Sequence, residues 1–325
     1  MQAVWYERNG PAREVLQFGE MPDPEPGPGE VRVRIHASGV NPSDWKTRSG
    51  SRPMLFPRVI PHSDGAGVID RVGPGVDPAR LGERVWVWNA QWKRAFGTAA
   101  GFVALPAEQA VRLPDRTGFE EGACLGIPAL TAHRAVTTDG PVEGQTVLVA
   151  GGAGAVGHYA IQFARLLGAA TVIATVSSPE KAARAREAGA DETIDYRTES
   201  LPDRVRAVTG GRGVDRVVEV DIAGNAAALP QIVAPGGLCV AYGSNAPEAT
   251  FAFGPMILSG AAVRFFIVYE LAPEARRRGI ADLTRWLEAG LVRHQIGETL
   301  PLARTAEAHE RVEQGRVVGN VIVAP

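Results

Sequence analysis

The segment Gly152-Ala153-Gly154-Ala155-Val156-Gly157 constrains the fold of this chain more than any other. It matches G-x-G-x-x-G, where the first glycine makes a tight turn and the second lets the main chain approach a pyrophosphate. The third glycine lets a helix pack against a strand. A chain with 38 glycines contains such matches by chance, so the flanking residues must support the motif. Here the apolar run Val147–Ala150 precedes the turn, and apolar residues at helical spacing follow it. The segment therefore predicts a dinucleotide site at a helix N-terminus.

Strand and helix patterns alternate after this turn. Strand-like runs occupy Thr171–Val176, Arg216–Val220 and Leu238–Tyr242, and a helix over Pro179–Ala188 is opened by Ser178 as N-cap. Alternating units of this kind predict a parallel sheet covered on both faces.

The first 115 residues follow a different pattern, with short strands separated by turns. Val31–Ile35 alternates with period two, Ala66–Val72 and Val85–Trp88 are further runs, and Pro22–Gly29 is an extended, proline-rich connector. This part predicts an antiparallel β domain. At roughly 100–200 residues per domain, 325 residues suit two domains.

Charge and composition narrow the function classes. The net charge of −2 gives no attraction to nucleic acid or anionic membrane, and the triplet Arg276-Arg277-Arg278 is expected to be a solvated helix face. Two cysteines make neither a disulfide framework nor a four-thiolate zinc site. The N-terminus lacks a secretory pattern, and no apolar run reaches 18 residues. We expect a cytoplasmic protein with no nucleic-acid or membrane partner.

The residues at the end of the second strand favour NADPH over NADH. An NAD site carries Asp or Glu there for the ribose 2′-hydroxyl, whereas this chain has Val176-Ser177-Ser178, followed by Lys181. Hydroxyls and an ammonium group suit a 2′-phosphate, which a carboxylate would repel. The chain has only three lysines, which adds weight to Lys181.

Several motifs together resemble one family. They are Gly39-Val40-Asn41-Pro42-Ser43-Asp44, Ser63-Asp64-Gly65-Ala66-Gly67-Val68, Gly126-Ile127-Pro128-Ala129-Leu130-Thr131-Ala132, the glycine-rich turn, Asp195-Tyr196-Arg197 and Gly315–Val323. With these motifs the chain resembles, nearly end to end, a zinc-independent medium-chain dehydrogenase/reductase of the quinone oxidoreductase (zeta-crystallin-like) branch.

The resemblance implies an α/β fold: a GroES-like antiparallel β domain plus a Rossmann doubly wound parallel sheet, with the active site in the cleft. We expect the GroES-like substrate domain over residues 1–122, the NADPH-binding domain over 123–265, and a C-terminal return over 266–325. The family is often dimeric, so a homodimer is expected, formed through edge strands near Leu238–Phe253.

The resemblance also implies site residues. Asn41 and Thr131 border the nicotinamide and, with Lys46, are the catalytic candidates. The cofactor-binding candidates are Asn41, Thr131, Gly152, Gly154, Ala155, Val156, Gly157, Ser177, Ser178, Lys181, Tyr196, Tyr242, Gly243, Ser244, Ile267, Val268 and Asn320. Asn320 replaces a lysine of the relatives, which weakens the contact carried over for that position.

No metal site is expected. Zinc-dependent relatives carry Cys, His and Cys where this chain has Asn41, Ser63 and Ile127, none of which supplies a thiolate or imidazole. A site shifted to His62 is the alternative. Without a metal to polarise an alcohol, reduction of an already electrophilic acceptor is favoured. Many quinone reductases have a tyrosine where this chain has Lys46, so Lys46 is either an electrophilic donor or an exposed lysine.

The sequence therefore predicts an enzyme that reduces quinones or α,β-unsaturated carbonyls with NADPH by metal-free hydride transfer. One alternative is a 2-enoyl-thioester reductase of the same superfamily. Another is a non-catalytic NADPH-binding protein with an RNA-binding or structural role, which the missing tyrosine motivates.

Overall fold

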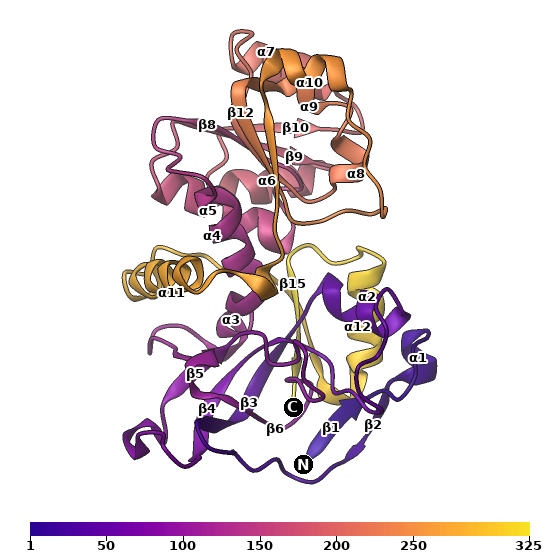
Figure 1. Cartoon of the computed structure of the whole chain (residues 1–325), viewed down its shortest axis with the longest axis vertical. Helices are drawn as coiled ribbons and strands as arrows, with labels where there is room; N and C mark the ends of the chain where they lie inside the picture. The colour runs from indigo at the N-terminus through magenta and orange to yellow at the C-terminus, as the bar shows by residue number, and fades with distance from the viewer. The chain divides into compact units, whose positions relative to one another are not determined.

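The computed structural model describes residues 1–325. The chain forms two compact units, the first made of Met1–Pro128 and Ile280–Pro325 and the second of Ala129–Gly279. The second unit is thus an insertion in the first. Both junctions fall later in the chain than the boundaries after residues 122 and 265 that the sequence suggests. Figure 1 traces both units along the chain.

The inserted unit is built on a six-stranded parallel sheet. Its strands are β8 (Thr146–Val149), β9 (Thr171–Val176), β10 (Glu192–Asp195), β11 (Val214–Glu219), β12 (Val233–Ala241) and β13 (Ala262–Phe265). Their order, β10-β9-β8-β11-β12-β13, is that of a dinucleotide-binding Rossmann sheet. The predicted doubly wound parallel sheet is confirmed.

Helices connect these strands. They are α4 (Leu130–Thr137), α5 (Ala155–Leu166), α6 (Pro179–Glu187), α7 (Leu201–Val208), α8 (Ile222–Asn225), α9 (Leu229–Ile232) and α10 (Phe253–Ser259), and α11 (Pro273–Glu288) runs on into the first unit. Buried residues such as Leu148, Ile173, Val217 and Leu229 form one core between sheet and helices. Burial of this apolar area stabilises the unit.

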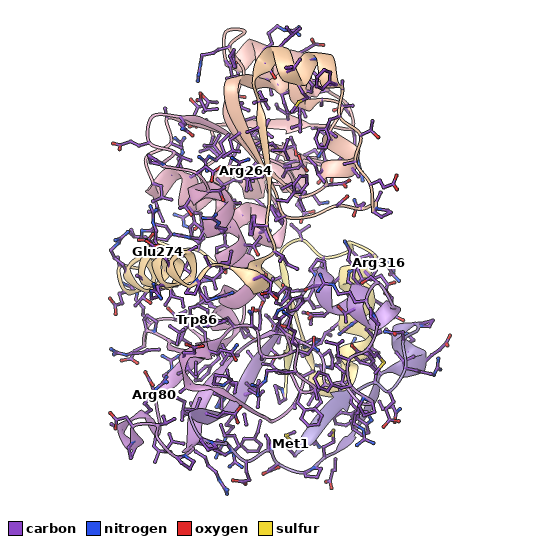
Figure 2. All side chains as sticks on the ribbon, in the orientation of Figure 1. Met1, Arg80, Trp86, Arg264, Glu274 and Arg316 are labelled. Atoms are coloured by element: carbon purple, nitrogen blue, oxygen red, sulfur yellow. The ribbon has the colours of Figure 1, made fainter.

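The first unit contains a seven-stranded, mainly antiparallel sheet. Its strands are β3 (Glu30–Val40), β4 (Asp64–Val72), β5 (Arg84–Val87), β6 (Phe102–Pro106), β7 (Ala110–Arg112), β14 (Ile296–Pro301) and β15 (Asn320–Ala324). Only β14 and β15 pair in parallel, and β15 joins the C-terminal strands to β3. Trp86 on β5, labelled in Figure 2, is fully buried. The sheet confirms the predicted GroES-like domain formed by both ends of the chain.

Shorter elements complete the first unit. The strands β1 (Gln2–Trp5) and β2 (Gln17–Glu20) form an antiparallel pair, and the helices are α1 (Ala12–Val15), α2 (Pro42–Ser49), α3 (Phe119–Gly122) and α12 (Thr305–Glu313). A π-helical stretch over Leu125–Ala129 leads from α3 into α4. No helix in the structure is both long enough and apolar enough to cross a membrane.

The strand expected at the sheet edge is a different one. The segment Leu238–Ala241 belongs to β12, which pairs with β11 on one side and β13 on the other. The open edge on this side is therefore β13, and the expectation of edge strands near Leu238–Phe253 is wrong, because β12 is an interior strand and no strand covers residues 242–261. The sequence pattern missed β13 because Arg264 interrupts its short apolar run.

Candidate active site

The glycine-rich turn has a distinct constraint at each glycine. A methyl group on Gly152 would lie 2.6 Å from Cβ of Ala174, and one on Gly157 would lie 2.2 Å from the carbonyl oxygen of Gly151. Gly154 has far more room, with only that same oxygen within 4 Å, at 3.2 Å. The outer two glycines therefore allow close packing, and the middle one leaves its main chain open to a ligand.

Helix α5 begins directly at this turn. Its N-cap, Gly154, has no side chain, so no side-chain acceptor covers the first-turn amides of Ala155 and Val156. Unpartnered amides and the positive end of the helix dipole suit a pyrophosphate. The geometry fits a dinucleotide.

The residues expected at the adenosine end lie together at the tip of β9. Nζ of Lys181 donates to Oγ of Ser177 at 3.0 Å, and Oγ of Ser178 caps α6 by accepting from the Lys181 main-chain N–H. The Tyr196 main-chain N–H donates to Val176 at the end of the strand, while the Tyr196 side chain is 55% exposed. The site presents an ammonium group, two hydroxyls and an exposed ring, and the two residues directly after β9 are serines rather than a carboxylate.

A cavity of about 650 Å³ opens where β11, β12 and β13 end. Tyr242, Gly243, Ser244 and Ile267, all expected on the nicotinamide side, line it together with apolar residues such as Phe251 and Phe266. Val268 is buried and is not part of this lining.

Asp221, for which sequence reasoning predicts no role, holds Asn245, the residue between the cavity-lining Ser244 and Ala246. Its carboxylate accepts hydrogen bonds from the main-chain N–H of Asn245 at 2.8 Å and from Nδ2 of Asn245 at 2.9 Å. Asp221 could have been identified from the sequence by its position just after β11, because ligands bind at the carboxyl ends of parallel strands.

Arg276 corrects the expectation of a solvated basic helix face. Its side chain is 6% exposed, and its Nη2 donates to the carbonyl oxygens of Val268 at 2.8 Å and Tyr269 at 3.2 Å. The cation holds the main chain that follows β13. A run of three arginines does not reveal which member the fold buries.

In the first unit, Asn41 is held by two carboxyl groups. It directly follows β3 and N-caps α2, and its main-chain N–H donates to Oδ2 of Asp44 at 2.7 Å. Its side-chain Nδ2 donates to Oδ2 of Asp64 at 2.8 Å. All three residues are buried, Asp64 completely. Pro42, with its fixed φ, starts the helix directly after Asn41.

Two motif glycines make room for Asp64. A methyl group on Gly126 would lie 2.4 Å from Oδ1 of Asp64, and one on Gly39 would lie 3.1 Å from its Cβ and 2.3 Å from the carbonyl oxygen of Ala123. Gly39 also pairs with Asp64 across the β3–β4 ladder. Glycines of two separate motifs therefore make room for the buried carboxyl group that a third motif contributes.

Burial favours the neutral form of both carboxyl groups. It raises the pKa of Asp44 to about 7, against a smaller lowering by the Asn41 N–H. The pKa of Asp64 is raised well above its usual range by burial and further by the nearby Asp44. The Asn41 amide and the Ile127 N–H oppose this rise in the pKa of Asp64 without reversing it, and Oδ1 of Asp64 has no hydrogen-bond partner.

The three positions that carry zinc ligands in zinc-dependent relatives surround this carboxyl group. Asn41 uses its amide nitrogen as a donor, and a donating nitrogen cannot ligate a metal. The structure contains no group of three His, Cys, Asp or Glu residues arranged to hold a metal ion. His62 contacts Ser38 at 2.8 Å and His309 at 2.9 Å and is fully buried.

The remaining candidates have contacts of their own. Lys46 is a half-buried residue of α2, with Nζ 5.8 Å from the centre of the Trp45 ring. Thr131 is buried in the first turn of α4 and belongs to the inserted unit. Nδ2 of Asn320 donates to the carbonyl oxygen of Gln295 at 3.0 Å, which gives this side chain a structural contact within the first unit.

Comparison with known proteins gives the same assignment for both units. Residues 27–115 match the alcohol dehydrogenase GroES-like domain, and residues 155–286 match the zinc-binding dehydrogenase model. The chain is 33% identical to quinone oxidoreductase of Pseudomonas aeruginosa over 96% of both chains. It is 31% identical to human quinone oxidoreductase over 95% of this chain and 93% of the other. The chain belongs to the quinone oxidoreductase family of medium-chain dehydrogenases/reductases.

Other members of this superfamily differ in their acceptors and cofactors. The chain is 30% identical to 2-haloacrylate reductase of a Burkholderia species, over 100% of this chain and 99% of the other. Among solved structures, an NAD-dependent alcohol dehydrogenase is similar, with a TM-score of 0.92 and 33% identity over both whole chains. A mycobacterial protein complexed with NADPH has a TM-score of 0.88 and 31% identity, again over both whole chains. Family membership alone therefore does not select the cofactor.

Proposed function

We propose that this protein reduces quinones or α,β-unsaturated carbonyls with NADPH, by hydride transfer without a metal. The observation that carries the proposal is the contact between Lys181 Nζ and Ser177 Oγ at the tip of β9. It places a cation and hydroxyls where an NAD site carries a carboxylate. The quinone oxidoreductases and the 2-haloacrylate reductase among the relatives support both acceptor classes.

The residues have separate tasks in this proposal. The amides at the start of α5 bind the pyrophosphate, and Ser177, Ser178, Lys181 and Tyr196 bind the 2′-phosphate. Bound NADPH supplies a hydride from its nicotinamide ring. Asn41 and Thr131 border that ring, and the residues around the cavity at the end of β12 exclude water from it. The acceptor oxygen receives its proton from solvent or from Lys46.

An activity panel with a chelator present tests the proposal. Oxidation of NADPH and of NADH is followed at 340 nm with 1,4-benzoquinone, 9,10-phenanthrenequinone, an enone and crotonyl-CoA. We expect NADPH-selective turnover with the quinones or the enone. Activity with crotonyl-CoA alone would assign the protein to the 2-enoyl-thioester reductases instead. Tight NADPH binding without any turnover would favour a binding protein.

The same proposal includes a homodimer in the cytoplasm, formed through the open edge at β13. The neighbouring helix α10 buries none of its residues, and Phe253, Leu258 and Phe265 are 76%, 88% and 63% exposed. An unpaired strand edge next to exposed apolar side chains favours pairing with a second copy. Sedimentation velocity should show a dimer, and Leu258→Asp should shift it to monomer, whereas a monomeric wild-type protein would contradict the proposal.

A further inference from the structure

Asn41 has a carboxamide whose two ends are chemically different. Because its Nδ2 donates to Asp64, planarity turns its Oδ1 away from that carboxyl group. A carboxamide held only by packing could rotate by half a turn and exchange donor and acceptor at similar cost. The bond to Asp64 removes this ambiguity.

The chain keeps Asp64 in a costly position. The carboxyl group is fully buried, its Oδ1 has no hydrogen-bond partner, and the like carboxyl of Asp44 is close enough to disfavour its charged form. Gly126 and Gly39 leave the space it occupies. A buried polar group of this kind is destabilising, so an apolar residue here would suit the fold better.

We propose that Asp64 is a positioning residue of the reaction, which holds the Asn41 carboxamide so that its oxygen faces the nicotinamide as a hydrogen-bond acceptor. The proposal rests on the proposed function in one respect, namely that Asn41 borders the nicotinamide. Asp64 then acts only through Asn41. Asp44 fixes the main chain of the same residue, so the two carboxyl groups set the position and the orientation of one side chain.

A double-mutant cycle on ligand binding tests this directly. NADPH affinity is measured for the wild type, Asn41→Ala, Asp64→Leu and the double variant, with 2′-phospho-ADP-ribose, which lacks the nicotinamide, as a second probe. Each single variant should weaken NADPH binding about three- to tenfold, as expected for one hydrogen bond. Binding of the second probe should not change.

The decisive result is the coupling between the two sites. If Asp64 acts through Asn41, the double variant binds NADPH no more weakly than Asn41→Ala alone. Losses that add would show a general structural role for Asp64 and overturn the proposal, as would unchanged NADPH affinity in Asn41→Ala. Asp64→Asn, which keeps an acceptor oxygen for Asn41, should bind within about twofold of the wild type.

Two further variants distinguish a specific loss of NADPH binding from simple misfolding. Ser38→Ala changes a fully buried residue of β3 that contacts His62 and Thr98 rather than Asn41, so its effect should add to that of Asn41→Ala. If Asp64→Leu does not fold, Asp64→Ala replaces it, with the melting temperature of every variant recorded. The cycle needs no turnover, so it gives an answer even if the activity panel finds no acceptor.

Discussion

At the residue scale, Lys181 is the side chain on which the proposed choice of NADPH depends. It lies half-buried in the first turn of α6, with Nζ against Ser177. A charge-assisted contact with a phosphate contributes about 1.5–3 kcal/mol, or about tenfold to a hundredfold in affinity.

Lys181→Ala should therefore raise the KM for NADPH by about tenfold to a hundredfold and leave the KM for NADH nearly unchanged. Steady-state kinetics with both cofactors measures the effect. Arg184→Ala is the matched control, since Arg184 lies on the same helix but pairs with Glu187. Equal weakening of both cofactors would show that Lys181 does not contact the 2′-phosphate.

The pair of His62 and His309 makes a second prediction at this scale. Burial lowers the pKa of His62 to about 3 and the pKa of His309 well below its usual value, with His62 and Arg48 adding to the second shift. In the unfolded chain both titrate near 6.5. The unfolded state therefore binds more protons below about pH 6.5, so this contribution to stability is complete above that pH and is lost as the pH falls.

His309→Gln should make the melting temperature less dependent on pH between 7 and 5, because one of the two titrating groups is gone. Scanning calorimetry across this range gives the slope for the wild type and the variant. Identical slopes would mean that the buried histidine pair does not cause the loss of stability at acidic pH.

Asp44 affects stability with the opposite dependence on pH. Because its pKa is raised to about 7 in the folded protein, its contribution to stability is lost as the pH rises toward 7.

At the element scale, the C-terminus of α4 depends on a residue from a strand. Nη1 of Arg216 on β11 donates to the carbonyl oxygens of Val136 at 2.8 Å and Thr138, and Nη2 donates to Gly140 at 3.4 Å. The guanidinium is buried, which lowers its pKa. A cation at this position satisfies the last carbonyl groups of the helix and its negative dipole end. Because α4 carries Thr131, this contact also secures one edge of the candidate site.

Arg216→Met should lower the free energy of unfolding of the inserted unit by about 2–4 kcal/mol, since it leaves buried carbonyl groups without donors. Urea unfolding followed by circular dichroism measures the change. Arg212→Met is the control: Arg212 is exposed and its ion pair with Asp215 is a surface contact, so its effect should stay below about 1 kcal/mol. Comparable losses in both variants would contradict a special role for Arg216.

These elements also show how far the sequence could predict the structure. Strands and helices near the glycine-rich turn follow from periodicity and capping, and β9 coincides with its predicted range. Long-range contacts do not follow in this way. Nothing local to Asp64, Arg216 or Arg276 shows that the fold will bury its charge, because each partner lies on a different element. The cofactor turn was therefore predictable, whereas the support of Asn41 was not.

At the scale of the whole molecule, the insertion of one unit in the other makes the sheet of the first unit depend on two distant segments of the chain. The last strand, β15, pairs with β3 on one side and β14 on the other. Its residues Val321, Ile322 and Val323 are buried. The N-terminal sheet is thus completed by the end of the chain.

Removal of residues 317–325 should therefore unfold the first unit and leave the inserted unit folded. Hydrogen exchange with mass spectrometry should show loss of protection in β3 and β4 while β8 and β9 keep theirs. NADPH binding should survive in weakened form, because the glycine-rich turn and Lys181 remain. Protection of β3 equal to that of the full chain would show that β15 is dispensable.

The placement of β15 also has a consequence during synthesis on the ribosome. The inserted unit is complete once Gly279 has left the exit tunnel, so it can fold while the chain is still growing. Until β15 has been synthesised, the edge of β3 that will pair with it has no hydrogen-bonding partner. An exposed hydrophobic strand edge of this kind is prone to aggregation. Translation thus finishes the inserted unit first, and the first unit becomes native only after β15 has been synthesised.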